Sequence, residues 1–267
     1  MRRPLLALAL SLIALPAAAH DFWLQPQTFQ VAAGAATPLT LQVGHGEARQ
    51  RSPIRKDRIV RFEAALPSGR LDLSGDLHPG EPDEDARLSL PAPGQYVVVL
   101  QTDDKAESHL TAERFNLHVE TEGLTPALEA RRGHETAEGS ERYSRAAKTI
   151  VQVGAGGGAS AALVPAGLPL EITPEVDPYA PDRQGALPIR VAWQGAPLAG
   201  ALVKLTDLAR DAEPIETHRT DAQGRAVFQV PTRGAWLLTV VWTRPLPADA
   251  EVDFETVFAS LSLGFDR

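Results

Sequence analysis

The feature that most constrains the fold is a succession of short runs of β-forming residues, each closed by glycine, proline or a small polar cluster. In the first half of the chain these runs are FQVAA, TPLTLQV, RIVRFEAAL, RLDLSG, ARLSL, GQYVVVLQT and RFNLHVE. Apolar and polar residues that alternate at this spacing are typical of antiparallel sandwiches. The run from Tyr96 to Leu100 is continuously apolar and predicts a buried strand. The sequence therefore predicts an all-β protein.

The same pattern restarts near Leu168, with the runs LPLEITP, ALPIRVAW, ALVKLTDL, IETHRTD, RAVFQV, AWLLTVVW and FASLSLGF. The order of the segments QGAPLAGALVKL and TDAQGRAVF is similar to that of a transthyretin-like sandwich repeat. In the turn TDAQG, Asp221 is expected to bond its own backbone while Gly224 supplies a positive φ. We predict two Ig-like or transthyretin-like β-sandwich domains, at residues 20–160 and 165–267.

A short helical segment is predicted to connect the two sandwiches, as an insertion near residues 124–150 of the first domain. Leu124, Ala127 and Leu128 are spaced by one helical turn and are followed by charged residues. The stretch from Tyr143 to Lys148 is a second short helical candidate.

Residues 1–19 have the features of a secretory signal peptide. Arg2 and Arg3 precede an apolar run from Leu5 to Leu15, and the segment closes on Pro16 and three alanines. A membrane anchor is the alternative, but a spanning helix needs about 20 apolar residues. We therefore expect cleavage after Ala19 and a periplasmic protein.

Charge and composition narrow the choice of ligand. The chain has 26 basic and 34 acidic residues, a formal net charge of −8, which argues against nucleic acid and favours cationic ligands, including metal ions. It has no cysteine, and its one methionine is Met1, within the signal peptide. A metal site must then use histidine, carboxylates or a terminal amine, which suits copper, nickel or cobalt.

The predicted metal ligands are His20 and His45. Cleavage after Ala19 would give His20 a free α-amine with an unperturbed pKa of about 8, so that the amine and Nδ1 can chelate one metal ion. His45, in LQVGHGEARQ, ends a predicted strand between Gly44 and Gly46, and a second imidazole there would complete a histidine brace. We expect Glu47 to orient the His45 ring. The alternative readings are a turn or cap residue for His20 and a solvent-exposed loop histidine for His45.

The other histidines are weaker candidates. The alternation in RFNLHVE places His118 on the polar face of a strand, and His78 precedes the turn at Pro79. His109, His134 and His218 are expected to be solvated. The sequence contains no G-x-S-x-G, no H-E-x-x-H, no cysteine nucleophile and no dinucleotide fingerprint, so we predict that the protein is not an enzyme.

Several segments together resemble one family: AHDFWLQP, VGHGE, FNLHVETEGL, ERYSRAAK, LPLEITPEVDPY, TDAQGRAVF and DFETVFASLSLGF. The chain resembles the domain of unknown function 4198 family (DUF4198), periplasmic proteins that are also labelled NikM-like or nickel-uptake-associated. The resemblance implies a secreted β-sandwich protein that handles nickel, cobalt or copper beside a membrane transporter component. His20 and His45 are the matching positions for a metal role. The family commonly has a tyrosine at the position of His118, so no third ligand is assigned.

Three functions are compatible with the sequence. The first is a periplasmic metal-binding protein accessory to transition-metal uptake or handling. The second is a non-catalytic structural or partner-binding module of the cell envelope. The third is a brace-type copper oxygenase, against which stand the aromatic content of 6% and the position of all four tryptophans in apparent core strands.

Overall fold

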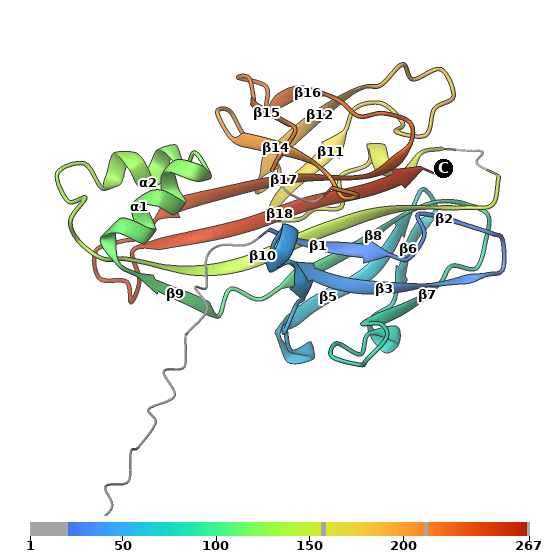
Figure 1. Cartoon of the computed structure of the whole chain (residues 1–267), viewed down its shortest axis with the longest axis horizontal. Helices are drawn as coiled ribbons and strands as arrows, with labels where there is room; N and C mark the ends of the chain where they lie inside the picture. The colour runs from blue at the N-terminus through green and yellow to red at the C-terminus, as the bar shows by residue number, and fades with distance from the viewer. Residues whose placement is uncertain (1–20, 156–158, 211–212, 266–267) are drawn as a thin grey trace, which may run out of the picture.

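The computed structural model describes residues 21–155, 159–210 and 213–265. The predicted signal peptide and His20 lie outside the described residues. The chain is mostly β, as predicted, and its strands form three sheets that lie in layers (Figure 1).

The middle layer is a ten-stranded sheet. Its main path runs in the order β15 (Glu216–Arg219), β14 (Leu202–Asp207), β17 (Gly234–Pro245), β18 (Phe254–Phe265), β10 (Gly139–Val153), β8 (Gly94–Thr102), β5 (Ile59–Leu66) and β6 (Gly69–Asp72). Strands β2 (Gln30–Val31) and β9 (Ala106–Leu110) also pair with β10. Strands β10 and β18 are parallel, whereas β17 and β18 are antiparallel.

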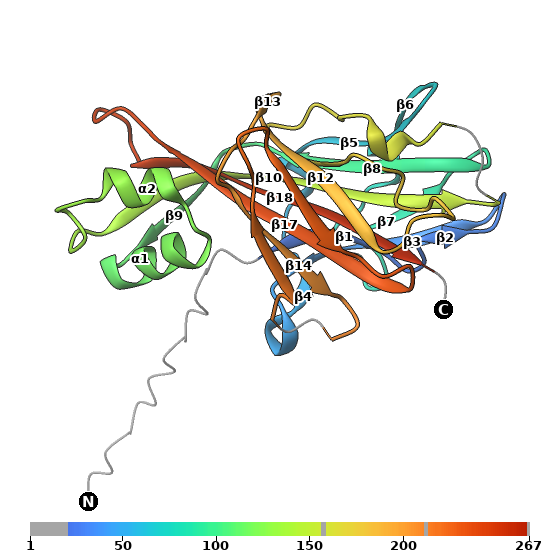
Figure 2. The same cartoon turned by 90° about the horizontal axis from the view of Figure 1, so that it is seen from above.

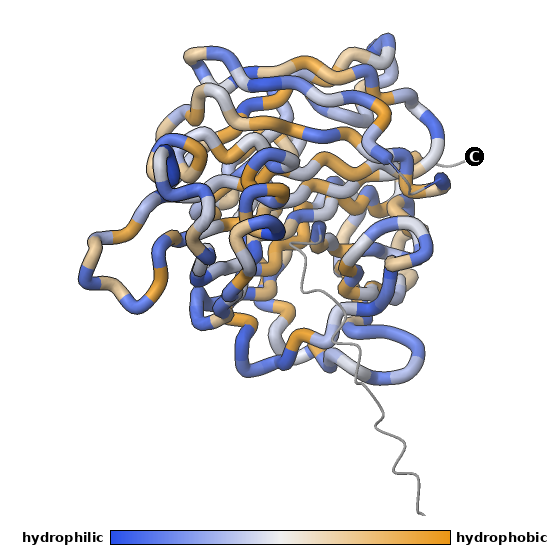
Figure 3. Tube along the Cα trace, turned by 60° about the vertical axis from the view of Figure 1, so that its left-hand side comes forward, coloured by the Kyte–Doolittle hydropathy of each residue, from blue (hydrophilic) through white to orange (hydrophobic). Residues whose placement is uncertain are grey.

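Two smaller sheets cover opposite faces of the middle layer, one below and one above it in Figure 1. The first contains β1 (Phe22–Pro26), β3 (Ala36–Val43), β4 (Gln50–Arg51) and β7 (Ala86–Ser89). The second contains β11 (Leu170–Pro174), β12 (Ala186–Trp193), β13 (Ala196–Pro197) and β16 (Arg225–Gln229). Short 3₁₀ turns occur at η1 (Gly46–Ala48), η2 (Lys56–Arg58), η3 (Ser74–Asp76) and η4 (Ala161–Leu163). Hydrophobic residues recur along the strands between the layers, and hydrophilic residues gather in the loops (Figure 3).

Strand β8 explains why part of the sequence lacks alternation. Val97 and Val99 join the core beneath the second outer sheet, whereas Tyr96, Val98 and Leu100 join the core beneath the first. A strand of a middle layer is buried on both faces, so both sets of side chains must be apolar. The predicted buried strand is confirmed.

The two predicted sandwiches share the middle sheet. Ala146 and Ile150 of β10 lie in the same core as Ile172 and Ile189, which come from the second half of the chain. The predicted boundary near residues 160–165 lies in the connection between β10 and β11, but the hydrogen-bonded sheet continues across both halves.

The helical prediction is partly wrong. Within the described ranges the α-helices are α1 (Ala112–Thr121) and α2 (Thr125–Ala130), which pack at one end of β17 and β18 (Figure 2). The stretch from Tyr143 to Lys148 lies in β10 instead, because continuous parallel pairing with β18 holds it extended. RFNLHVE lies in α1: Phe115 and Val119, four residues apart, are buried, whereas Leu117 is 63% exposed. Two apolar residues four positions apart share a face in a strand and in a helix alike, and only the residue midway between them, Leu117, lies on the opposite side of a helix.

A buried ion pair joins the middle sheet to the second outer sheet. Lys148 Nζ of β10 lies 2.6 Å from Glu171 Oε1 of β11, with side-chain exposures of only 2% and 3%. The Glu171 carboxylate also accepts hydrogen bonds from the backbone N–H groups of Ala166, Gly167 and Leu168. The carboxylate is therefore compensated by one cation and three backbone donors.

Replacing Lys148 with methionine is expected to lower the free energy of unfolding by about 3–5 kcal/mol, because the Glu171 carboxylate would remain buried without its cation. Urea denaturation measures the change. Arg55→Met is the matched control: it removes an exposed ion pair with Asp57 and should leave the urea midpoint nearly unchanged. A Lys148→Met protein as stable as the control would show that the pair does not hold the layers together.

Candidate functional site at the start of strand β1

A glycine-bounded turn presents His45 where β3 ends and β1 begins. Gly44 and Gly46 have φ of 86° and 54°, a region that favours glycine. A Cβ on Gly44 would lie 2.5 Å from the carbonyl oxygen of Ala48, so the turn also requires glycine for space. The Gly44 N–H donates to the carbonyl oxygen of Asp21 at 3.1 Å, which places the His45 turn beside the residue that follows His20.

The Asp21 carboxylate holds the His45 ring. His45 Nε2 lies 2.7 Å from Asp21 Oδ2, and both side chains are largely buried, at 25% and 12% exposure. The Thr239 hydroxyl of β17 donates to the same carboxylate oxygen at 3.1 Å. We expected Glu47 to orient the ring, and this was wrong: Asp21 does so.

Ring stacking restrains His45 from another direction. The Trp23 ring lies nearly parallel to the His45 ring, with centroids 5.6 Å apart and an interplanar angle of 11°. The Arg49 guanidinium lies 5.0 Å from the centroid of the Trp23 ring. Trp23 is fully buried in β1, as its place in a predicted core strand required. The orientation of the His45 ring is thus set by a hydrogen bond and a stacking contact together.

The electrostatic surroundings keep Asp21 ionised. Burial alone would raise its pKa, but the hydrogen bond and charge of His45, the charge of Lys204 and the hydrogen bond from Thr239 outweigh burial and lower it. Lys204 is itself largely buried and lies 2.7 Å from the Glu122 carboxylate. An ionised carboxylate in this position favours a positively charged partner at His45, either a proton or a metal ion.

His118 belongs to a second buried cluster. It was predicted on the exposed face of a strand, and that was wrong: it lies on α1 with 8% side-chain exposure, and its Nε2 is 3.9 Å from Glu141 Oε2. Burial and the charge of Lys204 lower the pKa of His118 to about 4. Burial raises the pKa of Glu141 to about 7, although the Thr256 hydroxyl donates to its carboxylate at 2.5 Å.

The other described histidines follow the sequence analysis. His109, His134 and His218 are exposed, and His78 precedes a turn at residues 79 and 80. Among residues 21–155, 159–210 and 213–265, no three His, Asp or Glu side chains are grouped to hold a metal ion. His45 and Asp21 are therefore two groups only, and the other predicted ligand, His20, lies outside the described residues.

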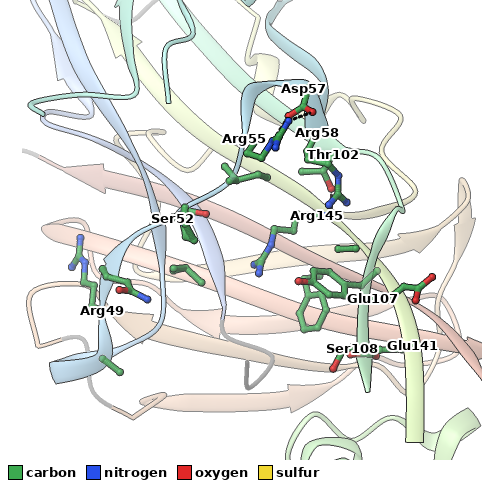
Figure 4. A pocket seen from close by; sticks show the side chains of 18 of the residues that line it. Arg49, Ser52, Arg55, Asp57, Arg58, Thr102, Glu107, Ser108, Glu141 and Arg145 are labelled. Carbon is green, nitrogen blue, oxygen red and sulfur yellow. Dashed lines mark hydrogen bonds and ion pairs between the residues drawn. The ribbon is translucent and has the colours of Figure 1, made fainter. Parts of the chain in front are cut away.

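A pocket of about 890 Å³ opens beside this site, between residues 47–58 on one side and strands β9 and β10 on the other (Figure 4). Arg145 of β10 projects into its middle, and Glu141 reaches it from the same strand. Sequence reasoning missed the pocket because its walls come from segments about 50 residues apart, for β9, and about 90 residues apart, for β10.

Comparison with known proteins identifies the family. Residues 17–244 match the family described as "Domain of unknown function (DUF4198)". The chain belongs to the DUF4198 family. This confirms the resemblance noted in the sequence, and the family description itself assigns no activity.

The comparisons with curated proteins and with solved structures assign no function to the DUF4198 protein. No curated protein sequence matches it. Among solved structures it is similar to one titled "D0-D1 domain of Intimin", at 14% sequence identity, covering 90% of this chain and 97% of that chain with a TM-score of 0.19. A TM-score this low carries no argument about fold or function. Within the part of the DUF4198 chain that the structure describes, no helix is long and apolar enough to span a membrane.

The buried pair in this DUF4198 protein predicts two opposing pH effects. His118 binds its proton less readily when folded, so between pH 4 and 6.5 its contribution to stability rises with pH. Glu141 binds its proton more readily when folded, so between pH 4.5 and 7 its contribution falls with pH. The two effects largely cancel where they overlap.

Glu141→Gln should remove the falling contribution and keep an acceptor for Thr256. Relative to the unchanged protein, its free energy of unfolding should increase from pH 4.5 to 7 by on the order of 3 kcal/mol, as measured by urea titrations across that range. His118→Gln is the partner variant and should shift the slope in the opposite sense. Identical pH profiles for Glu141→Gln and the unchanged protein would refute the raised pKa of Glu141.

Proposed function

We propose that the protein is exported, is cleaved after Ala19, and binds a transition-metal ion in the cell envelope through His20 and His45. Copper and nickel are the favoured ions, with cobalt a third possibility, and the role is accessory to metal uptake or handling beside a membrane transporter component. The proposal is for a binding protein and not for an enzyme.

The observation that carries this proposal is the 2.7 Å contact between Asp21 and His45 Nε2. In metal sites, a carboxylate commonly binds one ring nitrogen of a histidine and so orients the other toward the ion. Asp21 is joined to His20 by one peptide bond, which separates their Cα atoms by about 3.8 Å. The residue that holds His45 is therefore the neighbour of the residue that would supply the new amine.

The proposed ligand atoms favour a transition metal of intermediate softness. A terminal amine and two imidazoles are nitrogen ligands, which suit copper and nickel better than calcium or magnesium. The ionised Asp21 carboxylate and the net charge of −8 both favour a divalent cation. Stacking on Trp23 reduces the freedom that the His45 ring would lose on binding.

The first test concerns the amine. Mass spectrometry of the exported protein should show that it begins at His20, and Cu²⁺ and Ni²⁺ titrations by calorimetry should then show binding at one site. A variant with one additional alanine before His20, its first residue verified in the same way, should bind at least about tenfold more weakly because the amine has moved away. Equal affinity in the two forms would rule out a ligand role for the amine.

The second test concerns the orienting carboxylate. Asp21→Asn should weaken metal binding by about 10–100-fold while His45 is retained, because the ring loses its charged partner. His45→Gln should weaken binding at least as much. His218→Gln is the matched control, since His218 lies 2.6 Å from the Glu216 carboxylate on the exposed strand β15, and it should bind like the unchanged protein. If all three variants bind alike, the metal is held elsewhere.

A further inference from the structure

The pocket beside β10 has the size of a small-molecule site. Its volume of about 890 Å³ falls within the range of clefts that enclose ligands of drug size (Figure 4). Its apolar surface includes Tyr143 and Phe258 on the middle sheet and Ile54 in the segment that follows β4. Neither Asp21 nor His45 is among the described residues that line it, so it is separate from the proposed metal site.

The charged side chains that line the pocket are already engaged within the protein. Each lining arginine has a partner: Arg49 binds Gln42, Arg55 binds Asp57, Arg58 binds Asp103 and Arg145 binds Tyr143. The lining carboxylates equal these arginines in number, so that the formal charges balance: Glu47, Asp57, Glu107 and Glu141. A charged ligand would have to compete with the existing contacts, whereas an uncharged ligand leaves them intact.

Glu141 is the buried polar group of this pocket. Its side chain is only 3% exposed, and it lines the pocket beside Ser108, its register partner on β9 (Figure 4). Its Oε2 accepts from the Thr256 hydroxyl at 2.5 Å, and His118 Nε2 lies 3.9 Å from the same oxygen. Oε1 has no hydrogen-bond partner among the residues that the structure describes, yet it stays accessible. One carboxyl oxygen is therefore left to a ligand.

A hydroxyl group is the ligand group that suits this carboxyl best. Burial raises the pKa of Glu141 to about 7, so both of its protonation states are present at neutral pH. A hydroxyl donates to a carboxylate and accepts from a carboxylic acid, and so matches either state. The apolar lining at Tyr143, Phe258 and Ile54 suits an aromatic body. We infer that this pocket binds an uncharged aromatic alcohol, with its hydroxyl on Glu141 and its ring against the apolar lining.

Three probe compounds separate the parts of this inference. Phenol has the ring and the hydroxyl, toluene has the ring alone, and benzoate has the ring with a negative charge. Titrating each into the metal-free protein at neutral pH and observing the ligand by NMR should show phenol binding at least about tenfold more tightly than the other two. Equal binding of toluene would overturn the inference in favour of an apolar cleft, and equal or tighter binding of benzoate would overturn it in favour of an anion site. No binding of phenol would also overturn it.

Variants of Glu141 test the hydrogen bond. Glu141→Met removes the carboxyl and keeps the length of the side chain, so phenol affinity should fall at least about tenfold while toluene affinity should not fall. Glu141→Gln keeps an uncharged group that both donates and accepts, and should bind phenol within about threefold of the unchanged protein. Equal losses of phenol and toluene affinity in folded Glu141→Met would show that Glu141 only shapes the pocket, and would overturn the inference.

Ser108→Trp tests the location independently. The larger side chain would fill the pocket from β9 beside Glu141, and phenol affinity should fall at least about tenfold. Thr217→Trp is the matched control, because Thr217 is exposed on β15, and it should bind phenol normally. If Glu141→Met does not fold, as judged by circular dichroism, Ser108→Trp decides. Retained phenol binding in folded Ser108→Trp would overturn the inference.

His45→Gln distinguishes this inference from the proposed metal function. Because His45 does not line the pocket, the variant should lose metal affinity and keep phenol affinity. Loss of phenol binding in metal-free, folded His45→Gln would show that the two sites are one, and would contradict a separate pocket for the alcohol.

Discussion

The parallel pairing of β10 with β18 is the constraint on which the rest of the structure depends. It runs from the pair Glu141–Phe254 to the pair Thr149–Ser262 and joins segments more than 100 residues apart in the chain. The other edge of β10 pairs with β9 at residues 139–143 and with β8 at residues 150–153, while β2 continues the β18 edge at Gln152 and Val153, so the strand is held along its whole length and at both ends on both sides. Three charged residues of this one strand therefore occupy fixed and different places: Glu141 near α1, Arg145 in the pocket, and Lys148 in the core.

Buried charge is tolerated here because it is compensated locally. Lys204 pairs with Glu122, and its charge also lowers the pKa of both Asp21 and His118. One buried cation thus favours an ionised carboxylate beside His45 and a neutral imidazole on α1. The two histidines consequently differ in chemistry: His45 faces an anion, whereas His118 is kept neutral by burial and a nearby cation.

The sequence predicts well those features that a few adjacent residues determine. The strand run from Tyr96 to Leu100 and the glycine-bounded turn at His45 were both found from a few adjacent residues, and the family from motifs spread along the chain. The role of Asp21 was missed because it depends on the register of β1 against β3, which no neighbouring residue reveals. The β10 strand was mistaken in part for a helix because Ala146 and Ala147 are buried in the cores on its two faces, which removes the alternation that marks a half-exposed strand.

The proposed metal site and the pocket beside β10 are linked in their electrostatics. Arg49 lines the pocket and lies over Trp23, which in turn stacks on His45. The charge of Asp21 acts on both His45 and Arg145. A cation bound at His45 would therefore change the field of Asp21 at Arg145 across a partly buried region, where such charges are weakly screened.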